Sequence, residues 1–212
     1  MIRFRLYFSA LLAALLLLSV GVPSSQAQGQ SATAAEIRQM LENRDQQIKS
    51  ILSGSDSTYT AEQRTQLKEL INGLIDFQVM SRQVLGPQWE GLSAEQRDEF
   101  VSVFRDVVRA QSMSDLGVYS SEVTYDQIEV HADSAFARTT TRYQGRSTPV
   151  DYVLTRREDE WRAEDIIVDG VGTVEPYANS FRPVVNQRGF ETLMNSLRKK
   201  RKEVMAKNKS EG

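Results

Sequence analysis

The sequence predicts an α+β fold, in which a helical N-terminal part packs on an antiparallel sheet of about four strands and further helices follow the sheet. Helical spacing of apolar residues at 34–52, and again after two capping motifs, indicates the first helices. Four runs rich in β-branched and aromatic residues come next, at 123–130, 135–143, 150–155 and 161–168. Short polar turns join these runs, which favours an antiparallel meander over parallel strands with long crossovers.

The N-terminus has the features of an export signal. Arg3 and Arg5 precede an apolar run at residues 6–20, which helix-breaking Gly and Pro residues follow. Small residues near Ala27 are typical of a cleavage site, so we expect a signal peptide at residues 1–27. The apolar run is too short to favour a retained membrane span. Because no Cys follows it, a lipoprotein anchor is excluded.

Composition excludes several kinds of site. The 212-residue chain contains no Cys, so disulfides, thiolate metal sites and a Cys nucleophile are impossible. The net charge of −2 becomes −4 once Arg3 and Arg5 leave with the signal peptide, and nucleic acid is therefore not an expected partner.

Basic residues concentrate at the C-terminal end. We expect one domain at residues 28–197, followed by a basic C-terminal tail at residues 198–212. The tail is either a solvated helix end whose charge complements the helix dipole, or a contact for anionic lipid or an acidic partner.

Two capping boxes mark helix starts. The sequences TAEQ at 60–63 and SAEQ at 93–96 each place a hydroxyl three residues before a Gln, so that both side chains bond early backbone N–H groups. We expect the first helix to continue to Leu85, where a Gly-Pro pair ends it. The second is expected to fade near Gly117.

Residues 149–181 form the segment around which the rest of the chain is organised. Alternating apolar residues, a charged turn and a β-branched return strand predict a β-hairpin at 149–168. Gly170 allows a sharp exit from the hairpin. Tyr177 and Phe181 then follow at helical spacing, so a sheet edge and a helix are expected to meet here.

Three ordered blocks in this chain carry a family resemblance. The motif WxxxDIIVDGVGTVxxYxxxF occupies residues 161–181, and upstream lie IDFQVMSRQVLGPQW at 75–89 and LSAEQRDEFVSVF at 92–104. Together these blocks resemble the MlaC family, also called toluene-tolerance auxiliary proteins, over about residues 74–197. Three ordered blocks are far more specific than any one of them.

The resemblance implies both a shape and a role. The implied shape is a curved sheet covered by helices, similar to the NTF2-like (nuclear-transport-factor-type) cone. The implied role is that of a periplasmic carrier that moves phospholipid between an outer-membrane lipoprotein complex and an inner-membrane ABC transporter with an MCE-type subunit, which maintains outer-membrane lipid asymmetry. It implies no enzyme activity, and no cofactor or metal beyond phospholipid as cargo. The chain departs from the family pattern at Gly172, Thr173 and Ala178, where Ser, Leu and Arg are common.

Apolar residues on the expected helices and strands are candidates for the lining of a lipid pocket. For any one of them ordinary core is the default, and the resemblance favours a pocket. The candidates are Val79, Met80, Leu85, Trp89, Phe100, Val103, Phe104, Val107, Tyr152, Leu154, Ile166, Val168, Val171, Val174, Tyr177 and Phe181.

The resemblance also suggests where the acyl chains lie. We expect them between the helix at 100–107 and the hairpin at 149–168, closed over by the helix that contains Tyr177 and Phe181. Among the strand residues, Val168 is the one that we most expect to line the pocket.

Two alternatives from other classes remain. A small-molecule enzyme of the same cone shape would use Asp165 or His131 as a base. The simpler interpretations of these two residues are a strand-end carboxylate that pairs with an Arg or caps a turn, and a surface histidine. A periplasmic adaptor that binds no lipid would have a filled core. No Gly-rich phosphate loop, metal-ligand spacing or nucleophile elbow appears in the sequence.

Overall fold

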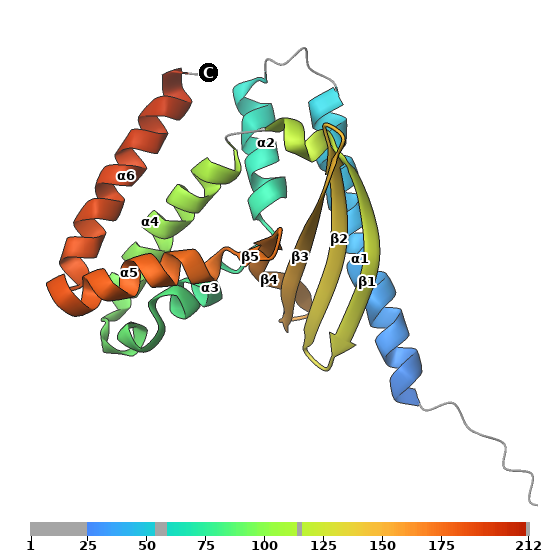
Figure 1. Cartoon of the computed structure of the whole chain (residues 1–212), viewed down its shortest axis with the longest axis horizontal. Coiled ribbons are helices and arrows are strands. Elements are labelled where there is room, and N and C mark those ends of the chain that lie inside the picture. The colour runs from blue at the N-terminus through green and yellow to red at the C-terminus, as the bar shows by residue number, and fades with distance from the viewer. Residues whose placement is uncertain (1–24, 54–58, 114–115, 211–212) are drawn as a thin grey trace, which may run out of the picture.

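The computed structural model describes residues 25–53, 59–113 and 116–210, and within these ranges side chains from residue 33 to residue 206. The expected signal peptide lies outside these ranges except for its last three residues, and it stays a prediction. The elements before the sheet are α1 (Ser25–Ser53), α2 (Ala61–Asn72), α3 (Phe77–Leu85), the 3₁₀ turn η1 (Gly86–Gly91), α4 (Ala94–Ser112) and the 3₁₀ turn η2 (Leu116–Ser120) (Figure 1). Both predicted capping boxes are present, at Thr60 before α2 and at Ser93 before α4.

The sheet is an antiparallel meander with the strand order β1-β2-β3-β4-β5. This arrangement confirms the α+β class and the predicted succession of hairpins. Each of the four long strands is at least as long as expected, and β5 is an additional two-residue strand. The bounds are β1 (Glu122–His131), β2 (Ser134–Tyr143), β3 (Arg146–Arg157), β4 (Glu160–Val168) and β5 (Val171–Gly172).

The expected single helix from Thr60 to Leu85 is wrong, because α2 ends at Asn72 and α3 begins only at Phe77. Between them, the backbone N–H of Asp76 donates to the carbonyl of Ala163 on β4 at 2.8 Å, and the N–H of Ala163 donates to the carbonyl of Leu74 at 2.8 Å. The chain leaves the helix here because the edge of β4 offers unpaired backbone groups. The Asp76 side chain then accepts from the N–H of Val79 at 3.0 Å and starts α3.

The apolar core consists of separate clusters. One face of the sheet packs on α1, and Ile37, Leu41, Leu154 and Ala163 are among its buried residues; we call this the sheet cluster. The side chains of α3, α4, α5 and α6 form a second one, the helical cluster. Figure 1 shows the corresponding arrangement, with α1 along the sheet and α4, α5 and α6 grouped on the other side of β5.

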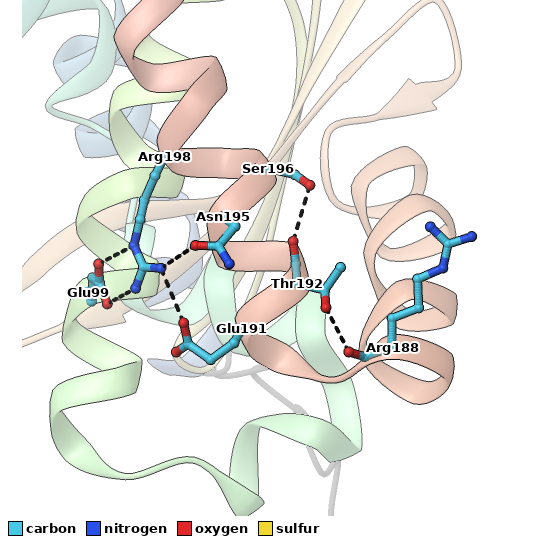
Figure 2. Close-up of polar contacts among 7 residues, drawn as sticks. All are labelled: Glu99, Arg188, Glu191, Thr192, Asn195, Ser196 and Arg198. Atoms are coloured by element: carbon cyan, nitrogen blue, oxygen red, sulfur yellow. Dashed lines mark hydrogen bonds and ion pairs between the residues drawn. The ribbon is translucent and has the colours of Figure 1, made fainter.

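Two helices follow the sheet, α5 (Val174–Arg188) and α6 (Phe190–Ser210). Gly189 separates them with a φ of +82°, a conformation that L side chains rarely adopt. The hydroxyl of Thr192 donates to the carbonyl of Arg188 at 2.7 Å and so satisfies one of the last carbonyls of α5 (Figure 2). The residues expected to form a basic tail continue α6 as far as Ser210. None of the helices within the described ranges has the length and hydropathy needed to cross a membrane.

Candidate functional site

The candidate site is a cavity of about 620 Å³ between α2, α4, α5 and α6, which we call the helical groove. Its volume falls within the range of about 300–1,000 Å³ that is usual for ligand pockets. The lining residues are Arg64, Thr65, Lys68, Asp106, Val107, Arg109, Ala110, Gln111, Met113, Tyr177, Phe181, Leu197, Lys200, Val204 and Met205.

The floor of the helical groove is apolar and rigid. Val107, Phe181 and Leu197 are each less than a tenth exposed. Phe181 lies in an aromatic network with α4, since its ring centroid is 6.0 Å from that of Phe104 and 5.4 Å from that of Tyr177. The contact with Phe104 is edge-to-face and that with Tyr177 is tilted, and such aromatic pairs stabilise beyond the effect of the buried area. The floor therefore offers hydrocarbon surface that is already packed from behind.

Tyr177 joins the floor of the groove to its polar margin. Its ring packs edge-on against Phe104 with centroids 5.0 Å apart, and its hydroxyl donates to Gln111 Oε1 at 3.0 Å. Burial raises the pKa of the Tyr177 phenol, so the neutral form persists and the side chain acts as a hydrogen-bond donor.

The margins of the helical groove carry basic side chains from three helices. Arg64 and Lys68 lie on α2, Arg109 on α4 and Lys200 on α6, and Asp106 is the acidic residue among the lining side chains. A carboxylate oxygen of Asp106 lies 3.8 Å from a guanidinium nitrogen of Arg201. The margin is therefore positive, and the floor is apolar.

A second cavity, of about 640 Å³, lies between the start of α3, α4 and the β3–β4 turn. Four Arg residues and four acidic residues line it, so its charges balance. Nothing in this lining selects an anion over a cation, and apolar surface is scarce. It is a weaker candidate than the helical groove.

The structure separates the sequence-predicted lining residues into several groups. Val107, Tyr177 and Phe181 line the helical groove. Behind that groove, the interior of the helical cluster holds Met80, Leu85, Trp89, Phe100, Val103 and Phe104, all buried, with Val174 packed against them. The sheet cluster holds Tyr152, Leu154 and Ile166. Val79 is half-buried on α3.

Two of the predicted residues are exposed beside the β4–β5 turn, where Val168 is 47% and Val171 is 61% exposed. The helices and the hairpin thus contribute to different clusters rather than to one continuous core. Acyl-chain contact by these residues stays a prediction.

Several groove residues were absent from the sequence-based prediction. They are Ala110, Met113, Leu197, Val204 and Met205. On α6, Leu193, Leu197 and Val204 lie on one apolar helical stripe. This periodicity is the sequence signal that could have identified Leu197 and Val204. The run of basic residues from Arg198 to Lys202 interrupts that stripe, and the sequence was therefore interpreted as a basic tail.

The two residues considered as catalytic bases, Asp165 and His131, lie away from the helical groove. Asp165 Oδ1 accepts from the backbone N–H groups of Thr173 at 2.8 Å and Val174 at 3.2 Å, and so caps the start of α5. His131 is exposed at the end of β1. Both positions agree with the simpler interpretations. Neither residue lines either of the two cavities described above.

Comparisons with known proteins show which solved structure and which family this chain resembles. A search of curated proteins finds no match. Among solved structures, the chain is similar to a phospholipid-binding protein from Ralstonia solanacearum in complex with a phospholipid, with a TM-score of 0.66 and 19% sequence identity. That match covers 81% of this chain and 97% of the other, and at this identity it shows a shared fold. The sequence matches the MlaC protein family over residues 42–199. Since this match spans most of the chain, the protein belongs to the MlaC family.

Proposed function

We propose that this protein is a periplasmic phospholipid carrier, which encloses acyl chains in the helical groove and moves lipid between an outer-membrane complex and an inner-membrane ABC-transporter complex. The observation that carries the proposal is the apolar floor of the groove beneath a basic margin, in a member of the MlaC family. The structural neighbour from Ralstonia solanacearum is a phospholipid-binding protein, which supports the proposal.

The energetics explain why such a carrier needs an apolar enclosure. A two-chain phospholipid has roughly 30 methylenes at about 0.8 kcal/mol each, so exposing all of them to water costs on the order of 25 kcal/mol. A carrier whose groove is as apolar as the bilayer makes exchange between the two nearly neutral. The carrier then needs no energy source of its own, and the direction of transport is set by its partners. The reaction is transfer without covalent change.

The direct test is to identify the cargo. Protein purified from the cell envelope should release phospholipid on extraction with organic solvent, as identified by mass spectrometry. Recovery of protein that is folded but free of lipid, and that takes up none from vesicles, would support the non-binding adaptor instead.

Filling the groove tests its location. Ala110 is a half-buried groove residue on α4, so Ala110→Trp should fill the groove and lower lipid recovery. Ala94→Trp is the matched control, because Ala94 is exposed on the same helix and outside the groove. Circular dichroism should show both variants folded.

A further variant tests the sheet-side location that the sequence favours. Val168→Asp places a charge beside the β4–β5 turn, where the side chain is 47% exposed and the delipidated protein can hydrate the carboxylate. If Val168→Asp abolishes lipid recovery and Ala110→Trp does not, the acyl chains lie between α4 and the hairpin and not in the helical groove.

The enzyme alternative has a separate test. Asp165 is committed to the start of α5 through two backbone N–H groups, which disfavours a role as a base. We propose that the protein has no catalytic function. Turnover of a lipid substrate by dialysed protein, with loss of that turnover in Asp165→Asn, would overturn this part of the proposal.

A further inference from the structure

Two lysines face the helical groove from opposite walls. Lys68 belongs to α2 and Lys200 to α6, and both line the groove. Lys68 is half-buried and Lys200 is exposed. Among the residues that the structure describes, neither side chain forms an ion pair or a hydrogen bond. Their ammonium groups are therefore available to a ligand.

The neighbouring charges differ in this respect. Arg109 lies 3.5 Å from Glu69, and Arg201, the residue after Lys200 on α6, lies 3.8 Å from Asp106. On the same helix, Arg198 is bonded to Glu99. Each of these contacts connects one helix to another and occupies the cationic group that forms it. Lys68 and Lys200 form no such contact between helices. Ordering either side chain would cost conformational entropy.

We infer that the helical groove selects phospholipids with a net negative headgroup, and that Lys68 and Lys200 hold the headgroup phosphate at its margin. This inference rests on the proposed function, since the acyl chains must occupy the apolar floor for the headgroup to reach the two lysines. An ammonium is a compact cation with three donors and binds phosphate as a point charge.

Charge balance favours an anionic lipid over a zwitterionic one. A zwitterionic headgroup would bring its own ammonium close to Lys68 and Lys200. Like charges at this range repel, and Asp106 alone on the lining supplies an opposite charge. An anionic headgroup whose polar end carries hydroxyls avoids that repulsion. Each basic group near a lipid surface is worth on the order of five-fold in affinity.

The experiment compares two headgroups in one sample. Delipidated protein is incubated at low salt with vesicles of equal parts phosphatidylglycerol and phosphatidylethanolamine, until the bound lipid no longer changes. The protein is then separated, and both lipids are quantified by mass spectrometry. We expect bound lipid to be enriched several-fold in phosphatidylglycerol, and the enrichment to fall at high salt, where screening is stronger.

Paired variants assign the effect to the groove. Lys68→Gln/Lys200→Gln should lose the enrichment, whereas Lys68→Arg/Lys200→Arg should keep it. Lys199→Gln/Lys202→Gln is the matched control, because both residues are exposed on α6, lie outside the groove and remove the same charge. The control should keep the enrichment, even if its reduced charge slows docking to the vesicles.

The outcomes separate the inference from the proposed function. Lipid bound without enrichment, or enrichment that survives in Lys68→Gln/Lys200→Gln, overturns the inference and leaves the carrier function standing. Failure to bind either lipid overturns both. Inorganic phosphate, added at matched ionic strength, should leave the enrichment unchanged. Loss of the enrichment on this addition would assign the two lysines to free phosphate instead.

Discussion

Arg198 on α6 donates two parallel hydrogen bonds to Glu99 on α4, from Nε to Oε1 at 2.8 Å and from Nη2 to Oε2 at 2.7 Å (Figure 2). The remaining nitrogen, Nη1, donates to Asn195 at 3.0 Å and to Glu191 at 3.2 Å. A fork of this kind fixes geometry more firmly than a single ion pair does. It sets the position of α6, and therefore of one wall of the helical groove.

Replacing Arg198 by Lys should loosen this wall. The charge remains, but a single ammonium cannot form both bonds to Glu99. We expect faster hydrogen exchange at the amides of α6 in Arg198→Lys, with little change in the sheet. Lys199→Ala, at an exposed neighbouring position, should leave exchange in α6 as it is in the original protein. Equal exchange in Arg198→Lys and the original protein would show that apolar packing alone positions α6.

The same contact predicts a pH dependence. The hydrogen bonds from Arg198 lower the pKa of Glu99 below its ordinary value of about 4.3. A lowered pKa in the folded state means that the ionised carboxylate stabilises the fold above that ordinary value, and that this stabilisation disappears as the pH falls through the lowered pKa.

Exchange in α6 should therefore be steady between about pH 7 and pH 5, after correction for intrinsic rates, and should accelerate below about pH 4. Glu99→Gln should remove most of this pH dependence. If the acceleration persists unchanged in Glu99→Gln, another carboxylate controls the position of α6.

Asp165 and Gly172 should be energetically coupled. Asp165 caps α5, and a Cβ added at Gly172 would lie 2.5 Å from Asp165 Oδ2, so that the carboxylate would have to move. We expect Asp165→Ala to cost about 1–2 kcal/mol in the free energy of unfolding, as loss of a helix cap does. Gly172→Ala should destabilise the original protein by displacing the cap.

A double-mutant cycle in urea measures the coupling. In the Asp165→Ala background, Gly172→Ala should cost much less, because the clashing group is gone. Strictly additive costs would mean that the cost of Gly172→Ala does not come from a clash with the Asp165 carboxylate.

Phe181 should contribute more to stability than Tyr177 contributes through its hydroxyl. Phe181 is 7% exposed and contacts both Phe104 and Tyr177, so Phe181→Ala should cost about 3–5 kcal/mol in the free energy of unfolding. Tyr177→Phe keeps the ring contacts and loses the bond to Gln111, which is worth about 1 kcal/mol. Chemical denaturation of the delipidated variants compares them. A small effect of Phe181→Ala would show that the groove collapses around the lost ring.

Local patterns predicted much of this fold. The capping boxes, the hairpins with short turns and the exit at Gly170 depend on neighbours within a few residues, and each is present in the structure. The family blocks predicted the MlaC relationship, which the match over residues 42–199 confirms. The interpretation of Asp165 as a capping residue agrees with its bonds to the start of α5, although Asp165 lies inside β4 and not at its end.

Other features depend on contacts between distant segments. The break between α2 and α3 depends on the backbone of Ala163, and nothing local at Leu74 records that partner. An apolar stripe shows which side of a helix is buried, but not whether lipid or protein covers it. Phe104 and Phe181 therefore have the same appearance in the sequence, as apolar residues at helical spacing. In the structure, Phe181 lines the groove and Phe104 lies behind it.

By itself, the sequence determined the α+β class, the order of the hairpins, the two helix starts with capping boxes and the family, because propensity, capping and turn chemistry act over short stretches of chain. Only the tertiary structure decided that, within the basic helix end after Leu197, Arg198 bonds Glu99 on α4 and Lys200 faces the groove. These residues have the same charge, and their roles differ because packing brings a carboxylate on α4 to one and leaves the other beside an open apolar floor.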